Sequence, residues 1–248
     1  MLQDPFKSFD LTQPRRVAEV LSSALWLYGQ WPLLFVALSA IVVVPYELVV
    51  LAVANTSPLG AGDAAGTALI VGLLESALVV PLISALQVHA VVSIAEAQTP
   101  NLGNVIARSL RVLPVVAAAE IVVLLGEAVG FVLLFVPGLI LALRWAVVAQ
   151  TAAIEGTDWP TALRRGAQLT RGNYLRIFAL LLIVGLVYLV LANIGIAIAG
   201  TGHGATQVLA GIVIVVLSRT FGALVTAVLY FDLRAREAGA QVGAARIY

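Results

Sequence analysis

Six charged side chains lie inside long apolar stretches of this sequence, and they are the residues best placed to do chemistry there. They are Glu47, Glu75, Glu120, Glu127, Arg144 and Arg219. A charged group in such surroundings is costly, so it is expected to face a bundle interior or a wet cavity and is a functional hypothesis by default. The carboxylates could carry a proton or a cation. The guanidinium groups could hold an anionic group such as a phosphate.

The depths of these charges predict that those on the second, third, fourth and sixth spans converge. At about 1.5 Å rise per residue, Glu75, Glu127 and Arg144 come out on the order of 10 Å below the outer membrane surface, with Arg219 deeper and Glu47 shallower. Glu120 and Glu127 are seven residues apart and so share a helix face. Two interpretations stay open, a functional polar site or interhelical ties that only hold spans together.

No other pattern in the sequence indicates catalysis. There is no cysteine, and His89 and His203 lie in separate segments. No metal-ligand spacing, serine nucleophile motif, phosphate loop or dinucleotide fingerprint is present. We therefore expect no enzyme activity, no catalytic residues, no cofactor and no metal.

The composition predicts an all-α integral membrane protein. Of 248 residues, 61% are hydrophobic and only 11% are charged, against about 25% charged in a soluble domain. Apolar runs of about 20 residues, enough to cross a bilayer, occupy residues 31–54, 68–94, 114–135, 138–154, 177–199 and 208–230. The third and fourth runs are joined by Val136 and Pro137, which predicts a tight hairpin. Pro45 and Pro81 fall inside runs and predict local kinks.

The basic residues predict the orientation, because cytoplasmic loops carry the excess of Lys and Arg. The loops at residues 55–67, 136–137 and 200–207 hold none. The inner arginines expected to contact lipid or carboxylates are Arg15, Arg16, Arg108, Arg111, Arg164, Arg165, Arg171 and Arg176. Both termini are therefore expected in the cytoplasm.

A repeated unit organises the chain as one membrane domain over residues 1–248. Three hairpins are each expected to follow a cytoplasmic-side amphipathic helix in the interface, at residues 15–30, 101–113 and 159–176. Asp158 is a plausible N-cap of the third, with Pro160 in its first turn. This gives an arm and helix at 1–30, a bundle at 31–230 and a cytoplasmic tail at 231–248. The even-numbered spans end in Glu96, Glu155 and Asp232, which could pair with the arginines.

Three stretches resemble the family of six-span prokaryotic proteins similar to the membrane domain of glycerophosphoryl diester phosphodiesterase. They are residues 16–28 from Arg16-Val17-Ala18-Glu19, residues 137–172 with Arg144-Trp145 and Leu169-Thr170-Arg171-Gly172, and residues 230–237 from Tyr230-Phe231-Asp232. Gly166 and Ala238 depart from the family pattern. The resemblance implies topology and a membrane role. It does not imply phosphodiesterase activity, since the catalytic barrel of the fused relatives needs roughly 250 further residues.

These observations lead to two expectations about function. The first is a non-catalytic, multi-pass protein of the bacterial plasma membrane, serving membrane organisation, lipid-related processes or partner binding. Its partners would be anionic membrane lipids, and a protein partner or a second copy, but not nucleic acid. The second is a small transporter or channel that uses the intramembrane Glu/Arg cluster. A water-accessible cavity would favour the second.

Overall fold

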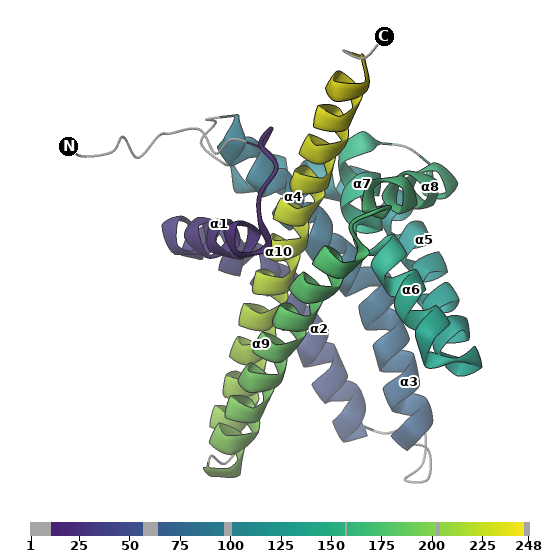
Figure 1. The fold of residues 1–248 in the computed structure, drawn as a ribbon. Coiled ribbons are helices and arrows are strands. Elements are labelled where there is room, and N and C mark those ends of the chain that lie inside the picture. Colours follow the sequence, from purple (N-terminus) through teal and green to yellow (C-terminus); the bar gives the residue numbers. More distant parts are fainter. Residues whose placement is uncertain (1–10, 57–63, 97–100, 157, 202–203, 246–248) are drawn as a thin grey trace, which may run out of the picture.

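The computed structural model describes residues 11–56, 64–96, 101–156, 158–201 and 204–245 (Figure 1). No strand occurs in these residues, so the all-α expectation is confirmed for them. The elements are α1 (Val17–Gln30), α2 (Pro32–Thr56), α3 (Ala64–Leu74), the π-helical turn η1 (Glu75–Val79), α4 (Val80–Ala95), α5 (Leu102–Leu133), α6 (Phe135–Trp145), α7 (Val148–Glu155), α8 (Trp159–Thr170), α9 (Tyr174–Thr201) and α10 (Ala205–Ala245).

Six helical segments are long and apolar enough to cross a membrane, as the sequence predicts. They are Pro32–Val53, Leu69–Ala95, Leu102–Leu133, Phe135–Glu155, Tyr174–Ile198 and Ala205–Gln241. A bilayer core of about 30 Å needs about 20 such residues, so each segment meets the requirement. The protein is therefore a multi-pass membrane protein by the length and composition of its helices.

The second segment changes helix type in its middle. It is built from α3, η1 and α4, with Glu75 as the first residue of the π-helical turn. The Val80 N–H donates to the Glu75 carbonyl, five residues back, so the helix is widened directly before Pro81, which has no N–H to donate. The predicted disturbance at Pro81 thus takes the form of a π-helical turn, a feature frequent at functional sites.

The expected separate helix at residues 101–113 is wrong. Those residues continue into the span as one helix, α5, with Pro114 inside it. The buried residues Val105, Ser109, Val116 and Ala119 recur at helical spacing on both sides of the proline. Packing along this continuous stripe keeps the helix intact at Pro114, although the proline has no N–H to donate a helical hydrogen bond.

The turn between the third and fourth spans also differs from the prediction. It is the single extended residue Leu134, while Val136 and Pro137 lie in the first turn of α6. The fourth span is itself broken between α6 and α7. The Thr170 hydroxyl donates a hydrogen bond of 2.9 Å to the Arg144 carbonyl at this break. It satisfies a backbone group that a continuous helix would have satisfied internally.

Two shorter helices pack across the bundle near one end. In Figure 1, α1 crosses the long helices α9 and α10, and α8 packs against α7. Most of the buried core lies at this same end, in α4, α7 and the stretch of α10 around Leu224, Tyr230 and Leu233. Several described side chains of α3 and of the later part of α9 are large, apolar and exposed, among them Leu69, Leu73 and Ile196, which is the pattern expected of helices that meet lipid.

Candidate functional site

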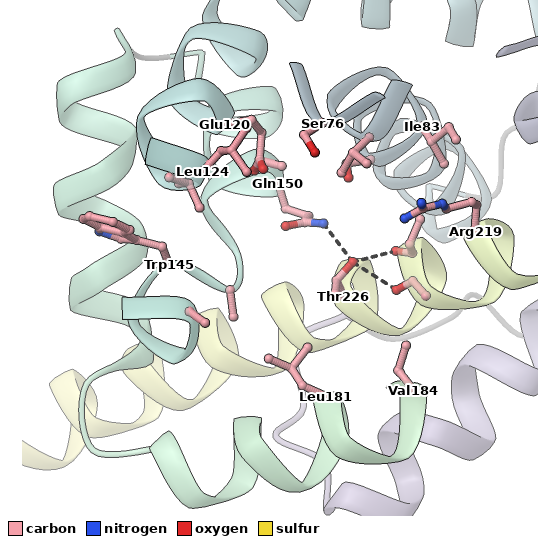
Figure 2. Close-up of a pocket in the computed structure, with 18 of the residues that line it drawn as sticks. Ser76, Ile83, Glu120, Leu124, Trp145, Gln150, Leu181, Val184, Arg219 and Thr226 are labelled. Carbon is pink, nitrogen blue, oxygen red and sulfur yellow. Dashed lines mark hydrogen bonds between the residues drawn. The ribbon is translucent and has the colours of Figure 1, made fainter. Parts of the chain in front are cut away.

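A cavity of about 710 Å³ lies between the spans, within the range usual for small-molecule sites. Residues of η1, α4, α5, α6, α7, α9 and α10 line it (Figure 2). One part of the wall is apolar, formed by residues such as Val123, Trp145 and Leu181. The polar part is formed by Ser76, Ser84, Glu120, Glu127, Gln150, Tyr188, Ser218, Arg219 and Thr226.

Two carboxylates from α5 line the cavity without a protein partner. Neither Glu120 nor Glu127 forms an ion pair or a hydrogen bond with any of the residues that the structure describes. Val123 and Leu124 lie between them and line the same cavity. This face of α5 therefore presents a carboxylate, an apolar pair and a second carboxylate in succession.

The third predicted carboxylate is paired. Glu75, at the start of η1, forms an ion pair with Arg219 of α10. Arg219 also lines the cavity, and its buried Nε has no hydrogen-bond partner among the described residues. The pair offsets the one positive charge that the described lining residues bring to the cavity. It also ties η1 to the last span.

Gln150 is the polar lining residue that sequence reasoning missed. Its side chain is only 2% exposed, and Nε2 donates a hydrogen bond of 2.9 Å to the Thr226 hydroxyl. Its Oε1 is buried and has no hydrogen-bond partner in the described part of the chain. In Figure 2 the Gln150 amide extends into the cavity from α7, between Thr226 and Glu120. A neutral residue in an apolar run carries no sequence signal of this kind.

Close helix approach shapes the wall of the cavity. A Cβ atom at Gly126 would collide with the Trp145 ring, and one at Gly130 would lie 2.8 Å from the Gly138 Cα. The two glycines, four residues apart on α5, therefore allow α5 and α6 to approach each other closely. This close approach sets the Trp145 ring against α5, where the ring forms part of the cavity wall.

Three of the six predicted deep charges, Glu75, Arg144 and Glu47, are not lining residues of the cavity. Arg144 is exposed on α6, and it has no ion pair with a described residue and is not among the lining residues. Its neighbour Trp145 faces the cavity instead, and adjacent residues on a helix point in directions about 100° apart. Glu47 is half-buried on α2 and also lies outside the lining. The structure thus brings Glu120, Glu127 and Arg219 together at the cavity, with Glu75 attached to this group through its ion pair with Arg219.

A separate ion network surrounds Asp232, which is fully buried on α10. Its carboxylate lies 3.0 Å from Arg176 and 3.1 Å from Arg236, and it accepts a hydrogen bond of 2.5 Å from the Arg15 backbone N–H. The Arg15 carbonyl in turn accepts hydrogen bonds from Arg176 and Arg236. The backbone before α1 is thereby fixed to α9 and α10.

A second ion network, around Arg165, ties α7, α8 and α10 together. Arg165 contacts Glu155 at 3.2 Å and Glu237 at 2.6 Å, and it uses both terminal nitrogens on the two oxygens of Glu237. Hydrogen bonding to Glu237 is the main reason that the pKa of Arg165 is raised above its usual value. The Tyr230 hydroxyl donates to Glu155 at 3.1 Å. This arrangement is a structural clamp, since every carboxylate in it is paired.

The remaining predicted inner residues lie mostly on the surface. Asp158 is the N-cap residue of α8, although its side chain makes no capping bond, and Pro160 lies in the first turn as expected. Glu96 ends α4, with its N–H donating to the Val92 carbonyl. Five arginines of this group are exposed: Arg16, Arg108, Arg111, Arg164 and Arg171.

Among the described residues, no group of three or more His, Cys, Asp or Glu side chains could hold a metal ion. No protein-family model, curated protein or solved structure matches this chain. The function is therefore inferred from the cavity, from the ion networks around Asp232 and Arg165, and from the exposed arginines.

Proposed function

We propose that this protein is a small membrane transporter that accepts a polar or charged molecule in the cavity between its spans. The observation that carries the proposal is a set of polar groups without a partner among the described residues, Glu120, Glu127 and Gln150 Oε1, around a cavity of about 710 Å³. Burying a carboxylate or an amide oxygen without a partner is costly. Such groups in a roomy polar space are satisfied by water or by a ligand.

The contrast with the paired charges supports a functional role for these groups. Interhelical ties bring opposite charges together, as at Glu75 and Arg219. Neither Glu120 nor Glu127 links α5 to a described residue of another helix. A purely structural role therefore leaves their presence in an apolar span unexplained. The proposal includes no catalytic step. The serine and histidine that lie within hydrogen-bond distance of each other, Ser109 and His89, are buried outside the cavity lining.

Water accessibility tests the proposal directly, because the natural chain contains no cysteine. Ser218 lines the cavity, and Ser218→Cys is nearly isosteric. In sealed vesicles we expect the thiol of this variant to react with a membrane-impermeant, water-soluble thiol reagent. The matched control is Leu189→Cys on α9, whose native side chain is 57% exposed outside the cavity lining and is expected to face lipid. If the Ser218→Cys thiol reacts no faster than the Leu189→Cys thiol from either side of the membrane, a wet cavity is refuted.

A second role, at the inner face, is supported by a different observation. The five exposed arginines Arg16, Arg108, Arg111, Arg164 and Arg171 all fall in the segments assigned to the cytoplasmic side. Each basic residue near an anionic leaflet contributes about 1 kcal/mol of attraction. We propose that both termini are cytoplasmic, that α1 and α8 lie in the interface on anionic lipid, and that the host membrane is a bacterial plasma membrane.

This second role agrees with the resemblance to the membrane-domain family, which remains our proposal from the residues. Replacing Arg164 and Arg171 with Gln should weaken association with anionic vesicles and leave the fold intact. Lipid association that is indifferent to anionic lipid content and to salt would count against the inner-face role. The orientation would be refuted if a reporter that works only outside the cytoplasm were active when fused to the C-terminus.

A further inference from the structure

We infer that the cavity binds an aliphatic diamine, a flexible chain with a protonated amine at each end. The inference rests on the proposed function, because it names the class of molecule that the cavity would accept. Its basis is the order of groups along α5, where Glu120 and Glu127 flank the apolar residues Val123 and Leu124 in one continuous wall. A ligand that complements this wall is cationic at both ends and apolar between them.

The charge of the wall is complementary to a cation. The lining contains two carboxylates without a protein partner among the described residues, and its one described cation, Arg219, is paired with Glu75. An ammonium group has three N–H donors and no acceptor. It matches the acceptors of this surface that have no partner among the described residues, namely the Glu120 and Glu127 carboxylates and Gln150 Oε1, whereas the unpartnered donor Arg219 Nε belongs to a guanidinium that is paired with Glu75.

The spacing of the two carboxylates disfavours a bare metal ion. Glu120 and Glu127 are seven residues apart on α5, which separates their Cα atoms by about 10 Å along the helix. Ligand oxygens lie only about 2–2.6 Å from a bound Ca²⁺ or Mg²⁺. One ion would have to draw both side chains together over that distance. An elongated molecule reaches both carboxylates where they are.

The apolar part of the wall favours an alkyl chain over a small hydrated cation. Val123 and Leu124 stand between the carboxylates, and Leu181 and Val184 of α9 line the same cavity. Figure 2 shows Leu124 on one side of the cavity and the α9 pair on another. Methylene groups buried between such side chains gain about 0.8 kcal/mol each. A small hydrated cation gains nothing from them, whereas the alkyl chain of a diamine does.

The test measures binding of 1,4-diaminobutane, 1,5-diaminopentane and butylamine to the full chain in uncharged, zwitterionic nanodiscs. We expect at least one diamine to bind about tenfold or more tightly than the monoamine, because only a diamine reaches both carboxylates. Glu120→Gln and Glu127→Gln should each reduce diamine affinity by about tenfold and bring it to the level of butylamine. The matched control is Glu47→Gln, a carboxylate of α2 outside the cavity lining, which should leave the affinity unchanged.

A second measurement keeps the inference testable if the Glu variants fold poorly. In the otherwise unaltered Ser218→Cys protein, a diamine should slow thiol modification, while butylamine at the same concentration should not. A thiol that reacts readily at this position but is not protected by any diamine overturns the inference and leaves the wet cavity standing. A thiol that does not react at all overturns the proposed function and the inference together. Equal affinity for diamines and butylamine also overturns the inference.

Discussion

The ion networks around Asp232 and Arg165 use the same residue types as the cavity, but in the opposite way. In these networks, Asp232, Glu155 and Glu237 each contact at least one arginine from another helix or from the chain before α1. In the cavity, Glu120 and Glu127 contact no described partner. The presence of a buried charge therefore does not identify a site. What distinguishes the cavity is that two of its carboxylates, Glu120 and Glu127, have no ion-pair or hydrogen-bond partner among the described residues.

The comparison predicts that removing a carboxylate lowers the free energy of unfolding much more in the ion networks than in the cavity. The largest effect is expected for Asp232→Ala, because Arg176, Arg236 and the Arg15 N–H all lose a buried partner. Breaking such a buried pair from one side costs about 3–5 kcal/mol. Reversible unfolding in mixed detergent micelles measures it. A loss below about 1 kcal/mol would show that the network is not structural.

The next effect concerns the shape of the cavity and not its charge. Gly126→Leu places a side chain where the Trp145 ring lies, so the ring must move or the helices must separate. Overpacking of this kind costs about 1–3 kcal/mol. The emission maximum of Trp145 should shift, which can be read in a background with the other tryptophans replaced by Phe. Gly29→Leu is the control, because nothing lies near its Cβ direction.

A smaller effect is expected at the clamp around Arg165. Arg165→Lys keeps the charge but loses the two-nitrogen contact with Glu237, which a lysine cannot reproduce. Because these groups are partly exposed, the expected loss is about 1 kcal/mol. Arg164→Lys, at an exposed neighbouring arginine, should have no measurable effect. If the two variants are equally stable, the contact between Arg165 and Glu237 does not stabilise the fold.

The smallest effect sharpens the comparison from the other side. Glu127→Gln breaks no contact with a described residue, so the free energy of unfolding should change by less than about 0.5 kcal/mol. The same unfolding experiment as for Asp232→Ala measures it. A loss as large as that of Asp232→Ala would mean that Glu127 is an interhelical tie after all.

Hydropathy and charge patterns predict much of the architecture, because length and polarity are properties of the chain itself. The six spans are located to within a few residues at most ends. The joint at Leu134 and the continuous α5 are not anticipated, since a proline permits either a break or a helix held by its neighbours. Only tertiary packing around Pro114 decides between these outcomes.

The site is predictable in part for the same reason. Counting residues gives the depth of a charge, and depth brought Glu75, Glu127 and Arg219 to one region. Depth does not give direction around the helix, which is why Arg144 faces away from the cavity while its neighbour Trp145 faces it. Gln150 is invisible to a search for charges, although its buried amide oxygen is one of the partnerless groups that single out the cavity.

The contact between Arg15 and Asp232 has a consequence for biogenesis. The two residues are 217 positions apart, and Asp232 lies near the end of the last membrane segment. A ribosome delivers Arg15 first, so its docking place is not complete until the whole bundle has been synthesised and inserted. The contact between Arg15 and Asp232 therefore forms late, after the last membrane segment has been made. A chain truncated before Asp232 would leave the arm undocked and open to quality-control proteases.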